Sequence, residues 1–336
     1  MGQAVGIRGA VIGYGGAFNM GKNHLNWMNA APGMGGVAAC DLDPARMAQA
    51  GADFPGLRTY TRVEDLLADD QVDLVTVITP HNTHAPLALQ CLAAGKHVIV
   101  EKPMCLTVAE ADAMLAAARA AGRMLSVFHN RRWDGDHVAM CDLIAEGVIG
   151  DVFHIEANGG GWGRPGDWWR SSKEVSGGAF YDWGVHFLFW ILRLHPGPLR
   201  SVTGFYHKRV WDHVSNEDHT QAILRWEDGA YADLQISSIA RAPKPRFRIL
   251  GTKGAILDEG GKGEFTVYGD CAGRTATFPV KYRQSDWNAY YTNIAAHLGE
   301  GAPLEITPEK ARRVIAVIET AEKSSRTGQA EPVPYE

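Results

Sequence analysis

Residues 7–24 of the chain read IRGAVIGYGGAFNMGKNH, a short apolar segment that runs into a turn rich in glycine. The first six residues are typical of a buried β-strand. Gly13 and Gly15 fit the first two glycines of the dinucleotide fingerprint, which allow a tight turn and a close approach of backbone to pyrophosphate. Phe18 stands where the spacing places the third glycine, and Gly21 replaces it if the turn holds three extra residues. The segment predicts a dinucleotide site; the alternative is a glycine turn with a structural role only.

The segments that follow indicate the fold class. Strand-like and helix-like patterns alternate, with strands expected at 7–12, 36–40, 73–78, 97–100 and 124–128 and helices at 44–51, 84–94 and 107–121. Thr107 with Glu110 forms a capping box at the start of the last of these helices, and Gly122 ends it. This alternation predicts an α/β fold, a doubly wound parallel sheet with helices on both faces.

After about residue 130 the pattern changes to longer alternating segments that predict a mostly antiparallel sheet. An Asp-Gly pair in WEDGAY predicts a hairpin there. Helices are expected at about 178–194 and about 308–326. We therefore expect a Rossmann domain over residues 1–130, an α+β domain over residues 131–305, and a C-terminal helix and tail over residues 306–336.

Composition narrows the functional class. The net charge of −5 comes without runs of like charge, which argues against nucleic-acid or anionic-membrane surfaces. No apolar segment reaches the ~20 residues of a membrane helix, and no signal-sequence pattern precedes the first strand. The five cysteines are scattered, without a Cys-x-x-Cys pair, which argues against a disulfide framework and a zinc site. We expect a cytoplasmic protein without a metal.

An acidic residue follows the second predicted strand. Asp41 stands where an acid usually binds the adenosine ribose hydroxyls and repels a 2′-phosphate, which favours NAD over NADP, with NADP still possible. In the alternative, Asp41 or Asp43 simply caps the helix that begins near Pro44. We assign Asp43 to the cap and Asp41 to the ribose.

The strand in KHVIVEKPMCL has an unusual end, because the buried run leads directly into Glu101, Lys102 and Pro103. The preceding strand leads into Thr79 and Pro80. Ligands of doubly wound sheets bind beyond the carboxyl ends of the strands, so both segments should face one crevice. There a lysine can polarise a substrate hydroxyl or exchange its proton, and Pro103 restricts Lys102 to extended geometry. The alternative is a solvated surface lysine.

A second pair of polar residues lies in GGAFYDWGVHFLFW. Asp182 and His186 are four residues apart on a predicted helix, so they share one face among aromatic and aliphatic neighbours. A histidine with a carboxylate to orient it is a common acid–base pair near neutral pH. The alternative is a core histidine hydrogen-bonded to the aspartate one turn earlier.

Together these segments resemble the glucose–fructose oxidoreductase, inositol dehydrogenase and MocA family. The matching stretches are GYGG, TPHNTHAPLALQCLAAGKHVIVEKPMCLTVAEADAML, NRRW, EGVIGDV, GGAFYDWGVH and AVIETAEKSSRTGQAEPVP. The resemblance implies a C-terminal α+β domain with a large open sheet that supports homo-oligomers, a dimer or tetramer. It implies NAD(P)-dependent oxidation or reduction of a sugar or cyclitol carbon. It also implies that Lys102 is catalytic with Asp182 and His186, that His84 is the family's histidine, and that the Lys102–Pro103 peptide is cis.

The loop GGGWGRPGDWWRSSKE follows the first strand of the second domain. Trp162, Trp168 and Trp169 can stack on the C–H faces of a sugar, while Arg164 and Arg170 bond its hydroxyls or an acidic group. The alternative is a loop folded on its own aromatic residues. Asn130 and Arg131, which follow the last Rossmann strand, line the cleft or join the domains.

These expectations define three sets of residues. The catalytic set is Lys102, Asp182 and His186. The cofactor set is Gly13, Gly15, Gly16, Ala17, Phe18, Asp41, Thr79, Pro80, His84, Glu101 and Lys102. The substrate set is Lys102, Asn130, Arg131, Trp162, Arg164, Trp169, Arg170, Asp182 and His186. Two other functions fit the same fold: a redox-neutral glycosidase that retains NAD, and a dinucleotide-sensing regulator, which would not need the acid–base set.

Overall fold

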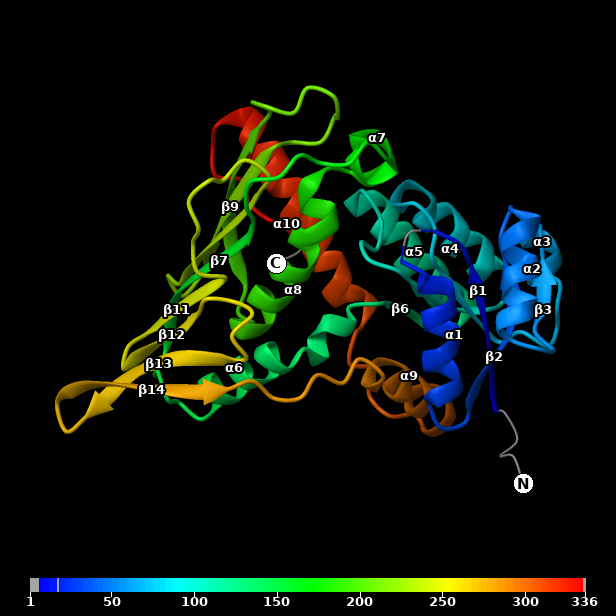
Figure 1. Cartoon of the computed structure of the whole chain (residues 1–336), viewed down its shortest axis with the longest axis horizontal. Coiled ribbons are helices and arrows are strands. Elements are labelled where there is room, and N and C mark those ends of the chain that lie inside the picture. Colours follow the sequence, from blue (N-terminus) through cyan, green and yellow to red (C-terminus); the bar gives the residue numbers. More distant parts are fainter. Residues whose placement is uncertain (1–5, 17, 335–336) are drawn as a thin grey trace. The chain divides into compact units, whose positions relative to one another are not determined.

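The computed structural model describes residues 6–16 and 18–334 and divides the chain into two compact units (Figure 1). The first unit consists of Met1–Asn130 and Trp287–Arg312. The second consists of Arg131–Asp286 and Arg313–Glu336. The chain therefore leaves the first unit after Asn130, returns to it over Trp287–Arg312 and then continues in the second unit.

A six-stranded sheet forms the centre of the first unit, in the order β3-β2-β1-β4-β5-β6 with every neighbouring pair parallel. The strands are β1 (Ile7–Ile12), β2 (Met34–Cys40), β3 (Arg58–Tyr60), β4 (Leu74–Val77), β5 (His97–Val100) and β6 (Leu125–Val127). The helices are α1 (Met20–Ala30), α2 (Pro44–Asp53), α3 (Val63–Leu67), α4 (His84–Ala93), α5 (Val108–Ala121) and α9 (Ala289–Glu300). The strand order is that of a dinucleotide-binding Rossmann sheet, and its reversal between β1 and β4 marks the place where ligands bind. The predicted doubly wound fold is confirmed.

Local signals set the ends of these helices. Glu110 N–H donates to the Thr107 hydroxyl and Thr107 N–H to the Glu110 carboxylate, both at 3.1 Å, so the capping box is confirmed. Gly122 ends α5 in the left-handed conformation. At the start of α2 the Asp43 carboxylate accepts from Ala45 N–H at 2.9 Å, which confirms Asp43 as the cap.

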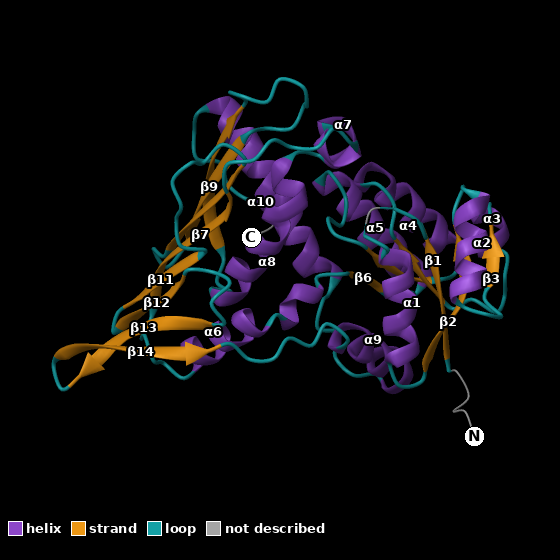
Figure 2. Cartoon of the chain, viewed as in Figure 1, coloured by secondary structure: helices purple, strands orange, loops and turns teal. Residues whose placement is uncertain are grey.

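The second unit is built on an eight-stranded sheet, seen in Figure 2 as the larger group of strands, in the order β14-β13-β12-β11-β7-β10-β9-β8. Its strands are β7 (Val152–Gly160), β8 (Leu199–His207), β9 (His219–Trp226), β10 (Tyr231–Ser237), β11 (Phe247–Gly251), β12 (Gly254–Asp258), β13 (Glu264–Cys271) and β14 (Arg274–Lys281). Within this order only β7 and β10 pair in parallel among the described strands. The Asp-Gly turn joins β9 to β10 as predicted, and the mostly antiparallel sheet is confirmed.

Close contacts with this sheet come from α8 (Val185–Leu194) and α10 (Pro308–Thr327). The second unit also contains α6 (Gly135–Ala145) and α7 (Lys173–Ser176). Nearly every residue of α8 is buried, and it packs on β7 and β10. Gly204 in β8 meets α10 so closely that a Cβ there would lie 1.9 Å from the Ala321 carbonyl oxygen. Among the described residues, the structure contains no helix of the length and apolarity required to span a membrane.

Three buried histidines should make the fold sensitive to acid. Burial lowers the pKa of His84 and His137, and burial together with the Lys102 charge lowers the pKa of His129 to about 3. In the unfolded chain these groups titrate near 6.5, so the unfolded state binds more protons below that pH. Stability should be retained above about pH 6.5 and fall below it, by up to about 1.4 kcal/mol per pH unit for each histidine. Thermal midpoints between pH 5 and 8 measure this, and His129→Gln should make the fall shallower. An equal slope in the variant would contradict it.

Candidate active site

The glycine turn after β1 leaves no room for side chains at two positions. Gly13 has φ +95°, and a Cβ there would lie 2.3 Å from the Ile78 carbonyl oxygen. A Cβ on Gly21 would lie 2.6 Å from the Tyr14 Cα, so only glycine lets α1 pack against the turn. Gly21 thus fills the role of the third glycine in the fingerprint, close helix–strand packing, from its displaced position. The turn fits a pyrophosphate approached by backbone.

The rest of the turn is open. Gly16 has φ +106°, and a Cβ there would meet no atom within 4 Å. Phe18 is 56% exposed. Ala17, which the sequence also assigned to the cofactor, lies outside the described residues.

The Asp41 carboxylate holds this turn through main-chain N–H groups, and its role at the ribose stays a prediction. One carboxylate oxygen accepts from Tyr14 N–H at 2.9 Å and Gly15 N–H at 3.1 Å, while the other accepts from Asp43 N–H at 3.0 Å. The side chain of Arg46 lies against Gly15, where a Cβ would be 2.6 Å from the Arg46 Nε. A carboxylate and a guanidinium therefore both lie against the turn.

The ends of β4 and β5 lie next to each other, because Val77 is the register partner of Val100. The segments after them, Thr79–Pro80 and Glu101–Pro103, therefore share one edge of the sheet, as predicted. The Lys102–Pro103 peptide is cis, as the resemblance implied. The fully buried ring of His84 joins the two segments, with its nitrogens 2.7 Å from the Pro103 and 2.8 Å from the Thr79 carbonyl oxygens. His84 thus positions both segments.

Titratable groups of the first unit lie near Lys102, among them Glu101, His84 and His129. Glu101 accepts from the Lys102 N–H at 2.9 Å. Burial alone would raise the pKa of the Glu101 carboxyl, but the hydrogen bond to His24 and the charge of Lys102 outweigh it and lower that pKa. His129 is kept neutral by burial and by the Lys102 charge. A lysine and an ionised carboxylate from the end of β5 therefore lie near a neutral imidazole that follows β6.

Asp182 and His186 lie where a π-helical turn meets α8. The turn spans Phe180–Gly184, and Gly184 allows the Phe180 ring to pack at 2.9 Å from where a Cβ would stand. The expected continuous helix thus begins with a wider turn, a feature common at functional sites. His186 is 6% exposed, and its ring lies 5.7 Å from that of Trp183.

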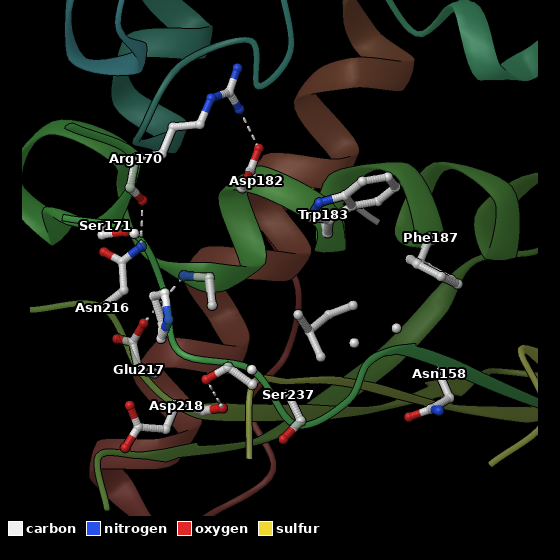
Figure 3. A pocket seen from close by; sticks show the side chains of 18 of the residues that line it. Asn158, Arg170, Ser171, Asp182, Trp183, Phe187, Asn216, Glu217, Asp218 and Ser237 are labelled. Carbon is white, nitrogen blue, oxygen red and sulfur yellow. Dashed lines mark hydrogen bonds and ion pairs between the residues drawn. The ribbon is translucent and has the colours of Figure 1, made fainter. Parts of the chain in front are cut away.

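Asp182 forms an ion pair with Arg170, which the sequence did not pair with it (Figure 3). The Arg170 guanidinium also lies over the indoles of Trp169 and Trp168, at 4.7 and 5.5 Å from the ring centroids. Aromatic faces attract such a cation and restrict its position. Arg170 thus fixes the Asp182 carboxylate, and whether that carboxylate orients His186 stays a prediction.

A pocket of about 710 Å³ lies beside this ion pair (Figure 3). Its main side chains are Asn158, Trp168, Arg170, Asp182, Trp183 and Phe187. Two further acids, Glu217 and Asp218, line it as well but serve the surrounding loops. Glu217 pairs with Lys173, and Asp218 accepts from the N–H groups of residues 209–211. The size is that of a small-molecule site.

Only some of the predicted substrate residues line the pocket. Arg170 and Asp182 line the pocket, while Trp162, Arg164, Trp169 and His186 stand in the same unit outside the described lining. Trp162 lies under Arg241 at 3.5 Å from its ring centroid, and Arg164 donates to His213 at 3.3 Å. Asn130 belongs to the first unit, as does Lys102, and Arg131 to the second.

Sequence reasoning did not assign Asn158, Trp183 and Phe187 to the pocket. Trp183 and Phe187 stand within the motif that supplied Asp182 and His186, so their proximity was a usable signal. Asn158 lies near the end of β7, just before the glycines that lead into the tryptophan loop. The guanidinium of Arg131 lies 5.3 Å from the Trp183 ring centroid. Arg131, which the sequence assigned to the substrate, is thus next to a pocket residue that it did not assign.

Comparisons with known proteins define the class. Residues 7–129 match the model of the oxidoreductase family with an NAD-binding Rossmann fold, and residues 137–257 match the GFO/IDH/MocA C-terminal domain. The uncharacterized oxidoreductase YdgJ of Escherichia coli is 32% identical over 256 residues, 76% of this chain and 71% of that protein. scyllo-Inositol 2-dehydrogenase (NADP(+)) IolW of Bacillus subtilis is 30% identical over 301 residues, 82% of each chain.

A solved structure agrees. The NAD-binding protein from Listeria innocua superposes with a TM-score of 0.85 at 28% identity, covering 98% of each chain. Fold, strand-end motif and matches together define an oxidoreductase with a dinucleotide-binding domain. The chain belongs to the GFO/IDH/MocA family of oxidoreductases.

Proposed function

We propose that this enzyme transfers a hydride between NAD, its favoured nicotinamide cofactor, and a hydroxyl-bearing carbon of a sugar, sugar derivative or cyclitol. The observation that carries the proposal is the pocket in which the Arg170–Asp182 ion pair stands among Trp168, Trp183 and Phe187. Aromatic faces stack on sugar C–H groups, and charged groups bond hydroxyls. The relative IolW carries the name of a cyclitol dehydrogenase, which supports the same substrate class.

The first unit would hold the cofactor. Backbone of Gly13, Gly15 and Gly16 would face the pyrophosphate and Asp41 the ribose, while Thr79, Glu101 and Lys102 would stand near the nicotinamide. The bound nicotinamide supplies the hydride acceptor for oxidation and the donor for reduction. Gly21 supports the assignment, because its lack of a Cβ is what allows α1 to start against the turn.

In the proposed chemistry the substrate hydroxyl binds both Lys102 and His186. During oxidation His186 removes the hydroxyl proton, and the Lys102 side chain stabilises the negative charge that develops on the oxygen. The carbon loses its hydride as the carbonyl forms, so one proton and one hydride leave the alcohol. Asp182, held by Arg170, contributes a fixed negative charge one helical turn before His186.

A substrate panel tests this function. Purified protein is mixed with NAD or NADP and with aldoses, uronates, inositols and alkyl glycosides, and absorbance at 340 nm is followed. NADH formed with one class of substrate, and lost in Lys102→Ala, supports a dehydrogenase and identifies the class. Tightly retained NAD with alcohol released from a glycoside and no net NADH would replace it with a redox-neutral glycosidase. Reversible cofactor binding without turnover of any compound would favour a dinucleotide-sensing regulator.

Cofactor preference should depend on the charges beside the glycine turn. Removing the carboxylate in Asp41→Ala should raise the NADP-to-NAD ratio of kcat/KM by about 10- to 100-fold, about 1.4 to 2.8 kcal/mol, because repulsion of the 2′-phosphate is lost. Asp41→Asn is the matched control for the structure of the turn, because it removes the charge while its amide oxygen can still accept from Tyr14 and Gly15 N–H. Arg46→Ala should lower use of NADP. A wild-type preference for NADP would contradict the role of Asp41.

A further inference from the structure

A buried chain of polar groups runs behind Lys102 in the first unit. Its first link is Glu101, whose carboxylate lies 3.2 Å from His24 Nε2 in α1. The other ring nitrogen of His24 lies 2.7 Å from the hydroxyl of Tyr291 in α9. That hydroxyl lies 3.1 Å from the hydroxyl of Thr76 in β4. His24, Tyr291 and Thr76 have no exposed surface, whereas the Glu101 side chain is 13% exposed.

Donors and acceptors in this chain match throughout. The ionised Glu101 carboxylate only accepts, so the Nε2–H of His24 donates to it. With a neutral imidazole, Nδ1 accepts from Tyr291 and the Tyr291 oxygen accepts from Thr76. Burial raises the pKa of Tyr291 well above its usual value, so its hydroxyl keeps the proton that it donates. The orientation of Glu101 is thus determined by three groups from three other elements.

The surroundings of His24 restrict its ring further. Phe128 lies edge-on at 4.3 Å between ring centroids, and Trp27 at 5.3 Å. A ring packed this way has little freedom to release or rotate away from Glu101. Of the whole chain of groups, the carboxylate at the tip of β5 is the part that reaches the ligand-binding edge of the sheet.

We propose that His24 and Tyr291 are positioning residues for Lys102. They act by fixing the Glu101 carboxylate, which accepts from the Lys102 main-chain N–H and lies beside the Lys102 charge. This inference rests on the proposed catalytic role of Lys102. The groups that couple electrostatically to Glu101 are His24, His84, Lys102, His129, Tyr290 and Tyr291. His24 and Tyr291 bond the carboxylate or its partner directly, which is why the effect is assigned to them.

Three variants separate positioning from packing. Tyr291→Phe removes only the hydroxyl, His24→Leu removes both ring nitrogens, and His24→Gln keeps one donor within reach of Glu101. With the substrate that the panel identifies, kcat should fall by about 10- to 100-fold in His24→Leu, a loss of the size known for groups that orient metal ligands, and less in Tyr291→Phe. His24→Gln should restore part of the loss. KM for the substrate, and the Kd for NADH from fluorescence titration, should stay within about twofold, because supporting groups act on the reacting group and leave uniform binding intact.

A readout without turnover accompanies the kinetics. The rate at which trinitrobenzenesulfonate labels Lys102, measured by peptide mass spectrometry, should change severalfold in His24→Leu and Tyr291→Phe. Labelling of Lys22, which lies in α1 beside His24 and pairs with Asp53, should not change. A parallel change at Lys22 would show a disturbed helix and overturn the positioning role.

The outcomes distinguish this inference from the proposed function. If Lys102→Ala abolishes turnover while folded Tyr291→Phe and His24→Leu keep wild-type kcat and Lys102 labelling, the network is structural only and the inference is overturned. A rise in the Kd for NADH at unchanged kcat would also overturn it. If Lys102→Ala itself keeps full turnover, the proposed catalytic role of Lys102 fails, and the inference fails with it.

Discussion

Lys102→Ala is expected to lower kcat by about 100- to 10,000-fold, the usual contribution of a group that transfers a proton or stabilises charge in the transition state. Lys102 follows β5 at the edge of the sheet where ligands of this fold bind, and its main-chain N–H is held by Glu101 at 2.9 Å. Removing the ammonium leaves the charge on the substrate oxygen without a partner. Steady-state kinetics with the panel substrate measures the loss, and NADH fluorescence separates it from any change in cofactor binding.

The matched control for this prediction is Lys102→Arg. Arginine keeps the positive charge but replaces a compact ammonium with a planar fork, so it should recover only part of the activity. A second control, Lys22→Ala, removes a lysine of the same unit that lies in α1 and pairs with Asp53. Substrate bound and turned over at the wild-type rate by Lys102→Ala would refute the mechanism.

The parts of this protein that the sequence predicts are those controlled by neighbours along the chain. The capping box of Thr107 and Glu110, the Asp43 cap and the hairpin at Asp228–Gly229 all depend on residues a few positions apart. Gly21 is also a local signal, because its late position relative to the dinucleotide fingerprint predicts a longer turn before the helix. The cis Lys102–Pro103 peptide came from resemblance, not from the local pattern.

The parts that the sequence did not predict depend on contacts between distant segments. Tyr291 reaches His24 across 267 positions because the segment Trp287–Arg312 returns to the first unit. Nothing in the pattern of α9 tells which sheet it packs against. Arg170 was expected to face a substrate, and its pairing with Asp182 depends on how the tryptophan loop folds over the π-helical turn.

His186→Asn is expected to have the second large effect, lowering kcat/KM for oxidation by about 100- to 10,000-fold. As general base the imidazole must be neutral to take the hydroxyl proton, so wild-type activity should fall as acid protonates it. Asparagine cannot accept that proton. The variant should therefore be slower, and its kcat/KM should no longer fall at low pH (the acid limb of the profile). The pH profile of kcat/KM measures both effects. His195→Asn is the matched control, because His195 follows the same helix and pairs with Asp228 at its far end.

The partner of His186 can be tested in the same experiment. If Asp182 and His186 act as one unit, the double variant should lose little more than His186→Asn alone, since effects within a catalytic unit are not additive. If Asp182 instead binds substrate together with Arg170, the losses of Asp182→Asn and His186→Asn should multiply in the double variant. In that case Arg170→Gln and Asp182→Asn should each raise KM. A His186→Asn variant with the wild-type rate and an unchanged acid limb would remove His186 from the mechanism and leave Lys102 as the base.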